Sequence, residues 1–336
     1  MGIRAGAEMT TFEMRFIALR CKDTIAPTGT LAQGVGAAQI NSVGERYQHK
    51  YGNTTSERLY AVVSENLSGR GPCALETIGI TYEQEKSLER AYLNMAPAQT
   101  LKWLETKMPP SIANVEIEGS EPYVVGGHTA SGYWIDRKRR TTLRGLFAAG
   151  DVAGGCPQKY VTGAFAEGEI AAESIAEFVA DNELLPIEQI NAVDEIKHYF
   201  DNPRGLYSTD ELEEAMQQSM DEYAGGIRSN YRYTDAQLTT ARAHIDRIEK
   251  LSGELRAESM YDLLKIYELR ERLTVCRVLI EHLRARRETR WHCFAEHADY
   301  PERDPKFNCF VNSRLVDGEI KIIFRRLEDE GVEKNQ

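Results

Sequence analysis

Residues 145–165 read GLFAAGDVAGGCPQKYVTGAF and decide the predicted fold class. The apolar run 146–149 ends at a Gly-Asp pair, a glycine-rich loop follows, and residues 164–181 have a helical composition. Strand, glycine-rich loop and helix in this order are typical of a nucleotide-binding α/β unit, whose ligands gather at the carboxyl ends of strands. We therefore expect a mixed α/β fold with a ligand site at this loop.

Other segments of the chain have hydrophobic patterns that predict helices and strands. Residues 81–106 are helical in pattern, and an apolar stripe with a spacing of three and four over 263–283 predicts a bundle helix. Short strands are expected at 12–19, 115–117, 123–125, 310–315 and 320–324. The chain thus combines an α/β region with a helical domain.

Composition excludes several classes of protein. The 336 residues include 41 Lys and Arg against 52 Asp and Glu, a formal net charge of −11, which disfavours a nucleic-acid-binding surface. No apolar stretch reaches the roughly 18–20 residues that span a bilayer. The six cysteines form no C-x-x-C pair, so we expect reduced thiols and no iron–sulfur cluster in this chain. The start lacks the order of a signal peptide, and we expect a cytoplasmic protein.

Several blocks of sequence carry a family resemblance. GGHTASG at 126–132, GLFAAGD at 145–151 and GAFAEG at 163–168 resemble the second FAD-contacting segment of the fumarate reductase/succinate dehydrogenase flavoprotein superfamily. AGAEM at 5–9 and APTG at 26–29 lie upstream, and RRETR at 286–290 and DYPERD at 299–304 lie downstream, in the superfamily's order. Residues 15–23 and 159–163 look most like the alpha subunit of adenylylsulfate reductase.

The resemblance implies an incomplete, doubly wound FAD-binding domain with a capping domain and a C-terminal helical domain. It divides the chain into the end of a first FAD-domain segment (1–20), the capping domain (21–118), a second FAD-domain segment (119–185), the helical domain (186–295) and a tail segment (296–336). The G-x-G-x-x-G fingerprint of such domains is absent, and the nearest candidate, at 34–37, lacks the third glycine. The sequence therefore resembles the C-terminal portion of a longer flavoprotein.

The resemblance also implies residues that bind an anionic substrate. An imidazole can hydrogen-bond an anionic oxygen and exchange a proton near neutral pH, the role implied for His128. A guanidinium can bond two oxygens of a sulfate or phosphate at once, the role implied for Arg20. Lys22 and Lys159 are the further cations expected to meet the substrate.

The cofactor implied is FAD. Glycines at 127 and 150 would allow close approach of the flavin, and the Asp151 carboxylate would accept hydrogen bonds from its ribityl hydroxyls. The backbone amides of Gly163, Ala164 and Phe165 would open a helix and point at the flavin ring. No metal site is expected, because the spacing of His292 and His297 does not place both on one helical face.

The leading hypothesis is an FAD-dependent oxidoreductase that reduces adenosine 5′-phosphosulfate to sulfite and AMP. Its electrons would come from a ferredoxin-like iron–sulfur subunit. One alternative is a fumarate reductase-like flavoprotein that acts on another acceptor, although Tyr160 stands where the dicarboxylate enzymes carry an arginine. A second alternative is a non-catalytic, partner-binding fragment that lacks FAD.

Overall fold

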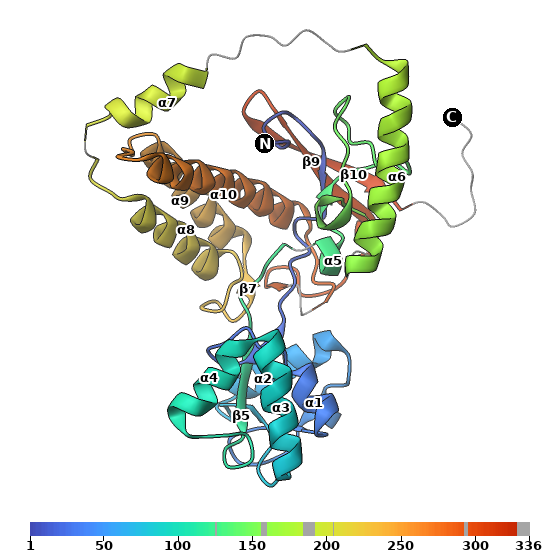
Figure 1. Cartoon of the computed structure of the whole chain (residues 1–336), viewed down its shortest axis with the longest axis vertical. Coiled ribbons are helices and arrows are strands. Elements are labelled where there is room, and N and C mark those ends of the chain that lie inside the picture. The colour runs from blue at the N-terminus through green and yellow to red at the C-terminus, as the bar shows by residue number, and fades with distance from the viewer. Residues whose placement is uncertain (125, 156–159, 184–191, 204, 292–294, 328–336) are drawn as a thin grey trace. The chain divides into compact units, whose positions relative to one another are not determined.

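The computed structural model describes residues 1–124, 126–155, 160–183, 192–203, 205–291 and 295–327. Contacts divide the chain into two units (Figure 1). The large unit comprises Met1–Arg15, Val124–Thr289 and Glu296–Gln336, and the small unit comprises Phe16–Tyr123 and Arg290–Ala295. Helices and sheets occur in both units, which confirms the mixed class expected from the sequence.

An antiparallel sheet of four strands in the order β10-β9-β1-β6 anchors the large unit. Its strands are β1 (Met9–Thr10), β6 (Gly132–Tyr133), β9 (Cys309–Val316) and β10 (Glu319–Arg326). Met9 of β1 lies opposite Tyr133 on one side and Ser313 on the other. The first ten residues thus join the glycine-rich middle of the chain to its C-terminal hairpin, which residues 310–315 and 320–324 predicted.

The helices of the large unit pack mainly on one another. They are α5 (Gly126–Thr129), α6 (Tyr160–Asp181), α7 (Ala192–Asp201), α8 (Thr209–Tyr223), α9 (Asp235–Ser252) and α10 (Met260–Ala285), with the short helices η2 (Gly150–Val152) and η4 (Pro305–Phe307). Helices α8, α9 and α10 pack side by side (Figure 1). The stripe predicted over 263–283 is buried on α10, for example at Leu263, Ile266 and Leu273. The bundle helix is therefore confirmed.

A buried ionic network ties α10 to the sheet. The Glu13 carboxylate lies 3.0 Å from Nδ1 of His282 and accepts a hydrogen bond of 2.7 Å from Nε of Arg286. Nε2 of His282 lies 2.8 Å from the Ser313 hydroxyl, and Arg286 also bonds Glu288 at 2.9 Å. Burial acts to raise the pKa of Glu13, but His282 and Arg286 outweigh it and lower that pKa. The 286–290 block that carries the family resemblance therefore begins with a structural arginine.

The small unit contains a second antiparallel sheet in the order β2-β5-β4-β3. Its strands are β2 (Leu19–Cys21), β3 (Gln39–Ile40), β4 (Ala74–Leu75) and β5 (Val115–Gly119). The helices are α1 (Gly29–Gly34), η1 (Gln48–Lys50), α2 (Thr55–Leu67), α3 (Tyr82–Met95) and α4 (Pro97–Thr106). The helical pattern at 81–106 is confirmed but forms two helices, because Pro97 begins a new one.

Three strand predictions were wrong. Residues 12–18 lie between β1 and β2, because Thr11 has a positive φ of 55°, which ends the extended backbone of β1. The run 146–149 is not a strand, since its backbone pairs with residues 139–141 through single bonds such as Ala148 N to Arg139 O. At 123–124, Tyr123 forms an isolated bridge with Phe16.

The stability of the small unit is predicted to depend on Glu65. Its buried carboxylate accepts two hydrogen bonds of 2.7 Å from Arg70 and one of 3.0 Å from Asn41. The hydrogen bonds from Arg70 lower the pKa of Glu65 to about 2. This stabilisation is present above the ordinary pKa of 4.5 and is lost as the pH falls toward 2.

Glu65→Gln should lower the free energy of unfolding of the small unit by about 2 kcal/mol at pH 7 and flatten its loss below pH 4.5. Urea unfolding at pH 7 and pH 3 measures both effects. Glu105→Gln, at an exposed position of α4, is the matched control and should unfold like the parent chain. Equal stability of the two variants would contradict the prediction that Glu65 stabilises the small unit.

Candidate active site

The candidate site lies in the large unit, where η2 contacts both α5 and α6. The Gly154 amide donates to the Tyr133 carbonyl at 2.7 Å, and the Gly155 amide donates to the Ala130 carbonyl at 2.7 Å. A Cβ at residue 154 would lie 2.1 Å from Cγ2 of Thr10 and 2.9 Å from the Tyr133 carbonyl oxygen. Glycine is required at 154 because the two backbones approach so closely.

The turn that carries the Gly-Asp pair is also anchored to α6. Gly150 has a φ of +70°, a conformation that L side chains rarely adopt, and its amide donates to Oε2 of Glu167 at 2.9 Å. The Glu167 side chain is buried. Residues 150 and 151 therefore have a fixed position relative to the first turns of α6.

His128 meets the first residue of α6. Its Nε2 lies 3.0 Å from the Tyr160 hydroxyl, and the two rings meet edge-on with centroids 5.5 Å apart. Both side chains are exposed. The predicted site residue His128 therefore lies beside the start of α6, and its neighbour Gly127 lies in the same helix, α5.

Exposed side chains of two kinds gather around η2. Asp151 presents a carboxylate to solvent. Large apolar side chains are exposed on η2 and at the start of α6, with exposed fractions from 56% to 73%: Val152, Tyr160, Val161 and Phe165. Uncovered apolar side chains beside a carboxylate and an imidazole are typical of a ligand-binding or docking surface.

The prediction for the helix start was wrong by one turn. Helix α6 begins at Tyr160, not at Gly163. In a regular α-helix the amides of Ala164 and Phe165 bond to carbonyls four residues earlier, so they are not free to donate to a ligand. The amides without an intrahelical acceptor belong to the first turn, residues 160–162.

Two of the predicted cations, Arg20 and Lys22, are already paired with carboxylates. Arg20, on β2 of the small unit, forms ion pairs of 3.3 Å with Glu118 and 3.1 Å with Glu121. Lys22 pairs with Glu116 at 2.8 Å, and this hydrogen bond raises the pKa of Lys22. An anion could bind here only by displacing these carboxylates. Lys159 and His292 lie outside the described residues.

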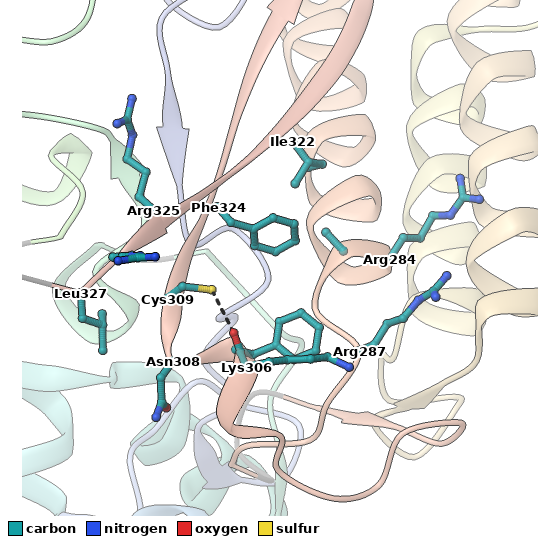
Figure 2. A pocket seen from close by; sticks show the side chains of 12 residues that line it. Arg284, Arg287, Lys306, Asn308, Cys309, Ile322, Phe324, Arg325 and Leu327 are labelled. Atoms are coloured by element: carbon teal, nitrogen blue, oxygen red, sulfur yellow. Dashed lines mark hydrogen bonds between the residues drawn. The ribbon is translucent and has the colours of Figure 1, made fainter.

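A basic pocket of about 1150 Å³ lies beside the β9–β10 hairpin of the large unit (Figure 2). Its lining includes the cations Arg284, Arg287, Lys306, Arg325 and Arg326. Four of these already face carboxylates, for example Lys306 with Asp304 at 2.7 Å and Arg325 with Glu8 at 2.5 Å. We therefore do not assign the pocket as the anion site.

Sequence reasoning missed two contributors to the candidate site. Tyr160 was considered only as a replacement for an arginine, yet its hydroxyl contacts His128. Glu167 was not considered, although it holds the Gly150 amide. An acidic residue on the face of a helix that is otherwise rich in Ala and Gly is a signal that could have indicated Glu167.

Gly154→Ala should lower the free energy of unfolding of the large unit by about 1–3 kcal/mol, because the added methyl group pushes against Thr10 and the Tyr133 carbonyl. Thermal denaturation measures the loss. The control is Gly168→Ala on α6, where a Cβ meets nothing within 4 Å and the helix gains about 0.5–1 kcal/mol. An unchanged melting temperature for Gly154→Ala would contradict the close backbone contact.

Comparisons with known proteins agree with the resemblance found in the sequence. No protein-family model matches the chain. The alpha subunit of adenylylsulfate reductase from Megalodesulfovibrio gigas is 28% identical over 381 aligned positions, which cover 94% of this chain and 57% of that protein. An uncharacterised FAD-dependent oxidoreductase from Methanocaldococcus jannaschii is 24% identical over 82% of this chain and 52% of its own length. The chain thus spans a little over half the length of these relatives.

Solved structures agree with the sequence matches. Adenylylsulfate reductase from Archaeoglobus fulgidus matches with a TM-score of 0.87 and 27% identity over 98% of this chain and 61% of that one. A quinol fumarate reductase from E. coli shares the fold, with a TM-score of 0.83 at 16% identity over 100% of this chain and 62% of that one. The chain therefore matches flavoproteins of the fumarate reductase superfamily in fold, and its sequence is similar to the alpha subunit of adenylylsulfate reductase.

Proposed function

We propose that this chain is part of an FAD-dependent oxidoreductase of the adenylylsulfate reductase type. The observation that carries the proposal is the meeting of His128, the η2 turn and the start of α6 at one exposed surface. The similarity to adenylylsulfate reductase over 94% of the chain supports the same reading. The substrate proposed is adenosine 5′-phosphosulfate, with sulfite and AMP as products.

The residues at this surface fit FAD in chemistry. The exposed Asp151 carboxylate suits the ribityl hydroxyls, and the apolar side chains of Val152, Val161 and Phe165 suit a flat aromatic ring. Gly127 and Gly150 are proposed to allow the flavin to approach the backbone closely, and the amides at the start of α6 present the positive end of its dipole. When bound, FAD supplies the redox chemistry.

His128 has the role of binding and orienting the anionic substrate. Its Nε2 lies 3.0 Å from the Tyr160 hydroxyl, and the imidazole is proposed to hydrogen-bond a sulfate or phosphate oxygen of the substrate. The single hydroxyl of Tyr160 cannot clamp a carboxylate with two bonds as the guanidinium of an arginine does. This favours a sulfate or phosphate ester over a dicarboxylate. Lys159 is proposed as a further cation on the same approach.

Arg20 and Lys22, on the small unit, are proposed to bind the sulfate or phosphate end of the substrate after exchange of partners. Each now pairs with a carboxylate of the 116–121 segment, and a dianionic substrate would replace these carboxylates. The same ion pairs favour one second candidate, a related flavoprotein that acts on an acceptor without a sulfate group. Turnover assays with adenosine 5′-phosphosulfate and with fumarate separate the two.

The remaining parts of the proposal concern partners and location. Electrons are proposed to come from a ferredoxin-like iron–sulfur subunit, because the cysteines show no cluster spacing. Cys21, Cys73 and Cys276 are free thiols, which supports a reducing, cytoplasmic setting. None of the described helices is both long and apolar enough to cross a bilayer.

His128→Ala is expected to lower kcat/KM for adenosine 5′-phosphosulfate by about 10- to 100-fold, because it removes a hydrogen bond to a charged oxygen of the substrate. Steady-state assays of the polypeptide as its organism produces it, with its electron donor, measure this loss. Tyr160→Phe keeps the ring contact without the hydroxyl and should cost less. His49→Ala, on exposed η1, is the control. Full activity of His128→Ala would remove the assignment.

Asp151→Ala is expected to weaken FAD binding by about 10- to 100-fold, the value of one or two hydrogen bonds to a charged group. Flavin absorbance after dialysis, or fluorescence titration, measures the affinity. Asp181→Ala, at the far end of α6, removes an equal charge and should retain FAD. Identical affinities for the two variants would show that Asp151 does not meet the cofactor.

A further inference from the structure

A second cluster of polar side chains lies in the large unit, at the paired strands β7 (Arg232–Tyr233) and β8 (Glu296–His297). The strands run parallel with Tyr233 opposite His297. Asp235 follows two residues after Tyr233, and Asp299 follows two residues after His297. The Asp235 amide donates to Oδ2 of Asp299 at 2.7 Å. The register therefore brings one histidine and two carboxylates together.

The histidine of this cluster lacks the hydrogen bonds that a buried polar group requires. His297 is 0% exposed and lies between the rings of Tyr233 and Tyr300, with centroids 4.8 and 4.6 Å away. Neither ring nitrogen has a hydrogen-bond partner among the described residues, although Nε2 lies 3.4 Å from Oδ1 of Asp235. Such a group calls for an explanation.

We propose that His297, Asp235 and Asp299 bind a divalent transition-metal ion of the zinc type. The atoms that they offer all lie within 4.8 Å of one another. Two ligands held about 2.1 Å from a tetrahedral ion are about 3.4 Å apart, which matches the separation of Nε2 of His297 and Oδ1 of Asp235. One imidazole with two carboxylates suits Zn²⁺ rather than Mg²⁺ or Ca²⁺.

Residues around the cluster influence its affinity for the proposed metal ion. The Tyr300 hydroxyl donates to Oδ2 of Asp235 at 3.3 Å, which leaves Oδ1 toward His297. Arg287 lies 3.8 Å from Oδ2 of Asp235 and over the Tyr300 ring. Its side chain is 56% exposed and can turn to solvent when a cation binds. The guanidinium therefore weakens metal binding, and its removal should strengthen it.

The ion would have a structural role. Asp235 is the first residue of α9, and Asp299 lies in the turn after β8. A shared ion would join the N-terminus of α9 to residues 297–299. Three protein ligands leave a fourth position for water.

The test is a calorimetric titration of the whole chain with Zn²⁺ alone, at pH 7 and without chelators. One equivalent should bind and raise the melting temperature. His297→Ala should weaken this binding by more than about 100-fold, above the 10- to 100-fold cost of losing an outer partner. Asp299→Asn should also weaken it, Arg287→Ala should strengthen it, and Glu302→Gln, an exposed carboxylate of the same loop, should leave it unchanged.

Two results would overturn the proposal. One is the absence of Zn²⁺ binding to the parent chain at micromolar concentration. The other is equal binding by the parent chain and His297→Ala, which would place the ion on cysteines or elsewhere. Circular dichroism of each variant shows whether it is folded, and the Asp299→Asn comparison stands if His297→Ala does not fold.

Discussion

The backbones of residues 130–133 and 153–155 lie in direct hydrogen-bond contact, and the rest of the candidate site depends on this contact. It holds Gly154 against the Tyr133 carbonyl and Gly155 against the Ala130 carbonyl. Helix α5 lies just before one segment and η2 just before the other, so His128 and Asp151 have positions set by the same pair of bonds. The Glu167 carboxylate extends the arrangement to α6 through the Gly150 amide. Side chains 23 and more residues apart are thereby held at one surface by the main chain.

This surface exposes both a carboxylate and apolar side chains to solvent, a combination that suits ligand binding. Two buried carboxylates elsewhere in the large unit are neutralised within the protein: Glu13 by Arg286, and Glu8 by Arg325. Around η2, in contrast, Asp151 and the apolar side chains of Val152 and Phe165 remain exposed. Burial of those apolar side chains against a flat aromatic ring would stabilise the complex at about 25 cal/mol per Å². The fold and the distribution of exposed charge thus both favour the surface around η2 as the proposed flavin site.

Regular periodicity and local motifs were predictable from the sequence. The stripe on α10, the β9–β10 hairpin and the cluster of His128 with the Gly-Asp turn rest on local patterns or on the family resemblance. Features set by distant partners were not predictable. The run 146–149 has strand composition but pairs with residues 139–141, Arg20 is matched by carboxylates about 100 residues away, and α6 begins before its apolar pattern does. The Asp235–His297–Asp299 cluster depends on a strand register that no spacing reveals.

Hydrogen–deuterium exchange of the polypeptide with and without FAD tests the central claim most directly. If α5, η2 and the start of α6 form the flavin surface, then amides of 126–133, 150–155 and 160–162 should exchange more slowly with FAD present. Amides in the bundle of α8 and α9 should not change. Protection confined to other parts of the large unit, with unchanged exchange at these three segments, would contradict the account.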